Sequence, residues 1–203
     1  MSIRATRAIT ERRECTSSPL LVTTMPGLFL VSLLMHPLFS SPDSPSDKEG
    51  PIHDFTWNPS SKEFAICYGF MPAKTTIFDQ RCHPIIEFPA HPHNFISFNS
   101  QGRLIALAGF GNLQGKVDVY DRRLMDVQSG GLRRIGGMEA GNTTHFEWSP
   151  DGRLILTAIL SPRLRVDNGV RLWHCTGTLL EVRSIDDLYQ VSIGGSIQYH
   201  HVD

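Results

Sequence analysis

Residues 103–121, with the sequence RLIALAGFGNLQGKVDVYD, decide between two folds. An apolar run leads into glycines at positions 109, 111 and 115, as it would in a strand that feeds a phosphate-binding loop. A dinucleotide fingerprint needs the spacing G-x-G-x-x-G with a helix opening at its last glycine, and here the third glycine comes one residue late. The P-loop ending G-K-[ST] does not occur in this stretch either.

The residues after Gly115 favour a hairpin instead. In KVDVYD, residues 116–121, Val117 and Val119 alternate with polar or aromatic residues, and this period of two is typical of a strand. A helix would begin with an N-cap and apolar residues three and four apart. The sequence therefore predicts two strands joined by a loop whose glycines supply positive φ angles. A nucleotide-binding enzyme that uses the loop Gly109–Gly115 is the less favoured alternative.

A threefold repeat extends this pattern along the chain. Each unit has an aromatic anchor, then a turn, a basic residue and an apolar run. The anchors are Trp57, Phe98 and Trp148, which lie 41 and 50 residues apart (98 − 57 and 148 − 98). Blades of a β-propeller repeat at about 40 to 45 residues and hold four strands each. The three stretches are HDFTWNPSSKEFAICYG (53–69), HNFISFNSQGRLIALAG (93–109) and THFEWSPDGRLILTAI (144–159).

Further strands complete each unit, and no segment has the apolar spacing of an amphipathic helix. The sequence predicts an all-β fold, an incomplete WD40-like β-propeller of about three blades of antiparallel four-stranded sheet over residues 47–192. The longer second interval is expected to form a glycine- and arginine-rich loop at residues 128–142. A fourth unit begins near residue 186 and then stops. Since propellers close with 4 to 8 blades, three blades leave the ring open. The additional strands expected are KTTIFD (74–79), KVDVYD (116–121), VRLWHC (170–175), PIIEFP (84–89) and GTLLEVRS (177–184).

The two ends of the chain differ from the repeats. Residues 1–46 contain an arginine-rich start, an apolar stretch at residues 20–39 and the beginning of a Ser/Pro-rich linker. This segment is expected to be disordered or a targeting sequence, with a stray strand or a mis-assigned gene start as the alternatives. Prolines, a glycine and a histidine inside residues 20–39 make it a poor transmembrane helix. Residues 193–203 form a divergent C-terminal end.

Composition is that of an ordinary globular protein. The chain has 203 residues, and this length is enough for one domain with a sizeable core. Hydrophobic residues make up 40% of it and charged residues 19%. With 19 basic and 20 acidic residues, the net charge is −1, so no strong positive field attracts nucleic acid. The four cysteines are scattered, and no two of them form a C-x-x-C motif. This pattern indicates reduced thiols in a cytosolic protein.

Three loop sequences carry a resemblance to a known family. They are YGFMPAK (68–74), AGFGN (108–112) and PRLRV (162–166), and with SPDGRLILTA (149–158) they resemble the propeller of eukaryotic translation initiation factor 2A. The resemblance runs from about Gly50 to Ser192. Residues 1–46 do not match it, and the earlier blades and charged C-terminal tail of the family are not found, so the chain resembles a fragment.

The resemblance implies a non-catalytic cytoplasmic factor that needs no cofactor and no membrane. It implies binding to the small ribosomal subunit and to initiator tRNA or mRNA, and contacts with other proteins through the blade loops. A generic WD-repeat scaffold for protein interactions is the alternative.

Four arginines are the candidate contacts to RNA or the ribosome. Arg163 and Arg165 lie two apart, and so on the same side of an extended loop. Arg133 and Arg134 are expected in the glycine-rich loop. Guanidinium groups bind phosphates well, although loops also carry charge that is merely solvated.

Metal-binding and hydrolytic motifs fail on spacing. Structural zinc needs two pairs of ligands, each two to four residues apart, and only His91 and His93 meet half of that. The adjacent pairs Cys82–His83 and His174–Cys175 would point to opposite faces of a strand. No serine lies in a G-x-S-x-G motif, and the neighbours Asp186 and Asp187 alone do not indicate acid–base catalysis. The sequence predicts no catalytic, cofactor-binding or metal-binding residue.

The purified chain is expected to carry far less than one zinc ion per molecule. Because the histidine and cysteine spacing cannot assemble a four-ligand site, treatment with EDTA should leave the melting temperature unchanged. Elemental analysis and thermal unfolding measure both quantities. One zinc per chain, with a lower melting temperature after chelation, would overturn the prediction.

Overall fold

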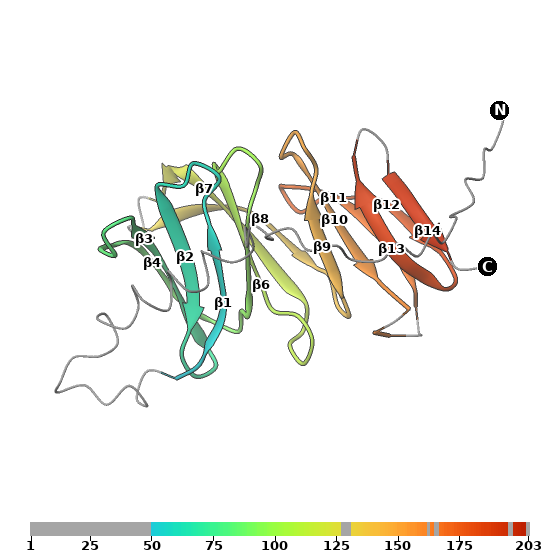
Figure 1. The fold of residues 1–203 in the computed structure, drawn as a ribbon, viewed down its shortest axis with the longest axis horizontal. Coiled ribbons are helices and arrows are strands. Elements are labelled where there is room, and N and C mark those ends of the chain that lie inside the picture. The colour runs from blue at the N-terminus through green and yellow to red at the C-terminus, as the bar shows by residue number, and fades with distance from the viewer. Residues whose placement is uncertain (1–49, 127–130, 162, 165–166, 195–196, 202–203) are drawn as a thin grey trace, which may run out of the picture.

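The described part of the chain consists of β-strands and turns. The computed structural model describes residues 50–126, 131–161, 163–164, 167–194 and 197–201, and these residues include no helix. Three four-stranded antiparallel sheets follow one another, and a two-stranded hairpin comes after them (Figure 1). The segments 1–46 and 20–39, singled out in the sequence, lie outside the described residues.

Each sheet is a meander in which strands that are neighbours in sequence are neighbours in space. The first sheet contains β1 (Ile52–Trp57), β2 (Glu63–Tyr68), β3 (Ala73–Asp79) and β4 (Pro84–His91). The second contains β5 (Phe95–Phe98), β6 (Leu104–Ala108), β7 (Lys116–Met125) and β8 (Leu132–Glu139). The third contains β9 (His145–Trp148), β10 (Leu154–Ile159), β11 (Gly169–His174) and β12 (Leu179–Ser184). The hairpin is β13 (Leu188–Ile193) with β14 (Ile197–His201).

The three aromatic anchors take equivalent places, which confirms the predicted repeat. Each ends the first strand of its sheet and lies opposite the second strand, in the pairs Trp57–Phe64, Phe98–Ile105 and Trp148–Ile155. The all-β fold with blade-like four-stranded sheets is therefore confirmed.

The glycine loop after β6 closes a hairpin, as predicted. Strands β6 and β7 pair antiparallel, and the Gly115 N–H donates to the Gly109 carbonyl at 2.8 Å. Gly111 and Gly115 have φ angles of 71° and 79°. Gly109 is needed for a different reason, because a Cβ there would lie 2.2 Å from the Pro92 carbonyl oxygen.

Two expectations about where strands and loops occur along the chain are wrong. Residues 128–142 are not one long loop, since Leu132–Glu139 forms strand β8 beside β7. Its glycines allow close packing, because a Cβ on Gly136 would lie 2.4 Å from the Cys175 carbonyl oxygen of the third sheet. The fourth unit also does not stop at β13, because β14 pairs with it. Gly194, which resembles a strand end in the sequence, follows β13 directly and precedes the second strand of this hairpin.

Apolar side chains fill the space between successive sheets. On β2, Ala65 and Cys67 belong to the core shared with the second sheet, whereas Phe64 and Ile66 belong to a cluster on the opposite side. A second core joins the second and third sheets around Val117, Val119, Ile155 and Trp173. A third joins the third sheet to β13 around Leu156, Val170 and Val191.

Buried asparagine side chains join neighbouring sheets at the end where the first and second strands meet. The Asn58 Nδ2 donates to the Gly102 carbonyl of the second sheet at 2.9 Å, and Asn99 Nδ2 donates to the Gly152 carbonyl of the third sheet at 3.4 Å. Both asparagines are 2% exposed. The two glycines have φ angles of 67° and 69°, and a Cβ on either would lie within 2.6 Å of the asparagine side chain. Glycine in each turn therefore leaves the space that the asparagine side chain of the previous sheet occupies.

Replacing Gly102 by alanine should destabilise the fold by about 3 kcal/mol. The substitution forces a left-handed angle on a residue with a Cβ, and it displaces Asn58 from a buried hydrogen bond. Urea unfolding measures the difference in free energy. Gly111→Ala is the matched control, because Gly111 has the same kind of φ angle but no atom within 4 Å of the added Cβ, so about 1 kcal/mol is expected. Equal losses for both variants would contradict the role of the asparagine contact.

Candidate nucleic-acid interface

Three loops lie at one end of the sheets. They are residues 69–72 between β2 and β3, residues 109–115 between β6 and β7, and residues 160–168 between β10 and β11. Because each joins the second and third strand of its sheet, all three lie at the same end, the lower one in Figure 1. We call these loops together the loop face. The sequences 68–74 and 108–112, singled out above, fall on it, and so do the two described residues of the third sequence, Arg163 and Leu164.

The loop face exposes apolar side chains. Phe70 is 68% exposed and Met71 is 41% exposed. Loops usually present polar residues to water, and large apolar side chains grouped at one place on a surface mark binding sites. The first loop is thus suited to contact with another macromolecule.

A cleft of about 520 Å³ lies on the loop face between the second and third sheets. Three partly buried rings contribute to its lining: Phe95, Phe110 and Phe146, with centroids 5.2 to 6.2 Å apart. Asn112 and Arg163 also line it. Aromatic rings stack on bases, amides hydrogen-bond to base edges, and guanidinium groups bind phosphates. The cleft offers all three kinds of group.

The position of Phe110 is set by a neighbouring asparagine. Asn94, in the connection between β4 and β5, accepts the Phe110 N–H at 2.8 Å through Oδ1 and donates to the Phe110 carbonyl at 3.0 Å through Nδ2. These two hydrogen bonds satisfy the backbone N–H and carbonyl of Phe110, which in a strand would pair with a neighbouring strand. The ring of Phe110 is therefore held in the cleft by the preceding connection.

A buried ion network fixes the same connection to the second sheet. Asp118, on β7, is 2% exposed and binds His93 Nε2 at 3.3 Å and Arg134 Nε at 2.6 Å, with Lys116 Nζ at 3.7 Å. Burial acts to raise the pKa of Asp118, but the His93 hydrogen bond and the charges of Arg134 and Lys116 outweigh it. The pKa of this carboxyl therefore lies below its ordinary value.

The three predicted arginines that the structure describes come from different elements of the fold. Arg163 is exposed on the loop face, and Arg165 lies outside the described residues. Arg133 and Arg134 lie on strand β8, so their predicted place in a loop is wrong. Arg133 is opposite Asp121 on β7, toward the other end of the sheet, and Arg134 binds Asp118.

The aromatic rings of the cleft were not predicted from the sequence. The available signal was Phe110, an aromatic residue at the tip of a glycine loop, where turn chemistry alone does not call for one.

The cysteine and histidine side chains that the structure describes do not form a cluster. Across the described ranges, no three His, Cys, Asp or Glu side chains come close enough to hold a metal ion. His91 and His93 have ring centroids 5.5 Å apart, and His93 is engaged by Asp118. Burial raises the pKa of the thiols of Cys67, Cys82 and Cys175. The absence of bound zinc stays a prediction.

Solved structures with this architecture include an initiation factor. A crystal structure described as that of a eukaryotic initiation factor superposes with a TM-score of 0.64 at 48% identity, over 71% of this chain and 34% of that one. The β-propeller domain of Cps50 (Swd1) from Myceliophteria thermophila superposes with a TM-score of 0.53 at 11% identity, which is a likeness of fold. The fold, together with the 48% identity to a solved initiation factor, therefore indicates a β-propeller of the translation initiation factor class.

Sequence comparison identifies the family. Residues 31–191 match the profile of the family described as Eukaryotic translation initiation factor eIF2A, and the chain belongs to that family. Eukaryotic translation initiation factor 2A of Schizosaccharomyces pombe is 48% identical over 71% of this chain, and that of Saccharomyces cerevisiae is 43% identical over 70%. The matched parts are 24% and 21% of those proteins, so the chain spans about a quarter of their length or less. The match begins inside the segment 1–46, and the boundary at residue 47 stays a prediction.

No helix long and apolar enough to cross a membrane occurs in the part of the chain that the structure describes.

Replacing Asp118 by asparagine should destabilise the fold by about 2 kcal/mol near pH 7, because the buried carboxylate makes charge-assisted contacts with Arg134 and Lys116 that a neutral amide cannot replace. Since the pKa of Asp118 is lowered in the folded state, its contribution is present above about pH 4, the unfolded value, and is lost as the pH falls through the lower folded value. Urea unfolding at several pH values should show the two proteins converging below pH 4. Asp186→Asn, at an exposed position, is the control and should change little. A constant difference down to pH 2 would contradict this account.

Proposed function

We propose that this chain is a non-catalytic platform in translation initiation that acts in the cytoplasm. It binds the small ribosomal subunit, together with initiator tRNA or mRNA, through the loop face. One observation carries the proposal: the loops that hold the sequences resembling the initiation factor family join the second and third strands of three different sheets, and their described residues lie at the same end of these sheets. A fold requires turns at both ends of its sheets, but it does not require unusual loops at one end only.

The chemistry of the cleft supports RNA as a ligand. The rings of Phe110 and Phe146 suit stacking, and Arg163 supplies a cation at the edge. Arg165 follows two residues later and is proposed to extend the same positive site. Exposed Phe70 and Met71 suit a protein surface of the ribosomal subunit. A generic WD-repeat scaffold is less favoured, because the similarity to initiation factors reaches 48% identity, whereas that to the Swd1 propeller is 11%.

The full chain should co-sediment with small ribosomal subunits in a salt-sensitive manner. Replacing both Arg163 and Arg165 by alanine removes two cations from the segment between β10 and β11. This should weaken binding and lower the slope of log affinity against log salt by about 1.4, since each contact to single-stranded RNA contributes about 0.7. Sedimentation at several salt concentrations gives the slope.

Lys62 and Arg153 provide the matched control, because both are exposed on turns at the opposite end of the sheets. Their double replacement by alanine removes the same charge and should leave the slope nearly unchanged. No co-sedimentation at low salt would refute the platform. An equal effect of both double variants would show that binding depends on net charge and not on the loop face.

A further inference from the structure

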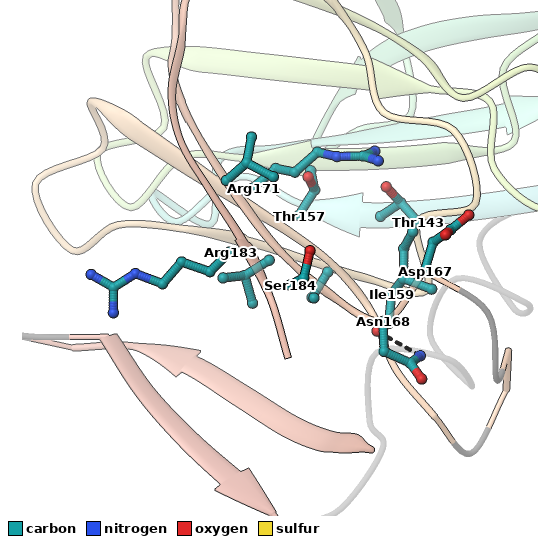
Figure 2. Close-up of a pocket in the computed structure, with 12 residues that line it drawn as sticks. Thr143, Thr157, Ile159, Asp167, Asn168, Arg171, Arg183 and Ser184 are labelled. Carbon is teal, nitrogen blue, oxygen red and sulfur yellow. Dashed lines mark hydrogen bonds between the residues drawn. The ribbon is translucent and has the colours of Figure 1, made fainter. Parts of the chain in front are cut away.

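A second, smaller hollow lies at the edge of the third sheet. It has a volume of about 180 Å³ (Figure 2). Its polar lining includes Arg171 from β11, Thr157 from β10, Ser184 from β12 and Thr143 from the connection before β9. In Figure 2 the Arg171 side chain extends past Thr157, whereas Arg183 points the opposite way. Arg183 is held by Glu181 at 2.5 Å.

Two hydrogen-bond donors in this hollow have no acceptor among the described residues. Arg171 is partly buried, and no carboxylate of the described ranges lies within ion-pair distance of it; Asp167, on the rim, is exposed and does not pair with it. Thr157 is 1% exposed and accepts the Trp173 Nε1–H at 2.9 Å, so its own proton remains to be donated. Thr157 is shielded from water, so an acceptor from outside the chain would give its hydroxyl a second hydrogen bond, whereas Arg171 is only partly buried.

The second sheet has an equivalent position, and there a charged side chain has partners within the chain. Arg171 lies opposite Thr157 in the register of the third sheet, as Asp118 lies opposite Leu107 in the second. The loop residue five positions before the anchor is His93 in the second unit (98 − 93) and Thr143 in the third (148 − 143).

In the second sheet this position therefore holds an anion, Asp118, that lies within ion-pair distance of His93, Arg134 and Lys116. In the third sheet the charge is reversed and the loop side chain is shorter. A hollow with a cation takes the place of this ion network. An anion from outside the chain would complete it.

We propose that this hollow binds a phosphate group, with the Arg171 guanidinium and the Thr157 and Ser184 hydroxyls as donors. The planar fork of arginine matches two phosphate oxygens at once, and the remaining oxygens accept hydroxyl protons. The choice of phosphate over other oxyanions rests on the proposed function, since a phosphate of an RNA strand on the loop face is its natural source. Thr143 lines both the hollow and the aromatic cleft, so the two sites are neighbours.

Calorimetric titration of the full chain tests the site with two probes, inorganic phosphate and a single-stranded octaribonucleotide. Arg171→Gln removes the charge and should weaken binding of the oligonucleotide at least tenfold. Arg171→Lys keeps the charge but loses the fork, so a loss of severalfold is expected; this variant also decides the matter if Arg171→Gln does not fold. Ser184→Ala should weaken binding about twofold. Arg153→Gln, on a turn at the opposite end, should change affinity less than twofold.

The outcomes separate this site from the platform itself. Oligonucleotide binding that is unaffected by Arg171→Gln refutes the phosphate site and leaves the proposed function standing. Binding of inorganic phosphate that depends on Arg171, without oligonucleotide binding, supports the site, assigns it to free phosphate and counts against the RNA function. Equal losses for Arg171→Gln and Arg153→Gln, or no binding of either probe, overturn the inference.

Discussion

The arrangement of the sheets depends on a buried asparagine side chain that reaches from one sheet to the turn of the next. Asn58 and Asn99 each donate to the carbonyl of a glycine in the following unit. The geometry leaves no room for a Cβ, so the turn and the asparagine are matched as a pair. The same asparagines also accept backbone N–H groups of their own turns, from Ser60 and Leu104, and so link the local turn to the neighbouring sheet.

The third unit departs from this pattern and is joined to the hairpin differently. Ser149 stands where the earlier units have asparagine, and its hydroxyl accepts the Leu154 N–H within its own turn. The carboxylate of Glu147 instead accepts the Ile193 N–H of β13 at 3.2 Å. Asp54 makes the corresponding kind of contact between the first and second sheets, accepting the Ile96 N–H at 2.7 Å. Each junction thus has a buried apolar core and at least one polar contact that sets its geometry.

Much of the fold could be predicted from the sequence, because it depends on local signals. The alternation in residues 116–121 and the turns after each aromatic anchor define strands without knowledge of distant contacts. Strand β8 could not be found in this way, since Gly136 and Gly137 resemble loop residues until the close approach of the third sheet is known. The candidate site was less predictable, because the cleft is formed by Phe95, Phe110 and Phe146, which come from separate strands and loops. The charge reversal at Arg171 becomes visible only when the registers of two sheets are compared.

The meander arrangement has a consequence for how this chain reaches its native state. Every pairing in the three sheets joins strands that follow one another directly, so each hairpin closes over a short loop at a small entropic cost. Pairing between consecutive strands avoids the long crossover connections that parallel sheets need and that slow their folding. A sheet can form as soon as its four strands have left the ribosome, before the next unit has been synthesised. The order of translation can therefore also be the order of assembly, with each finished sheet serving as the template for the one that follows.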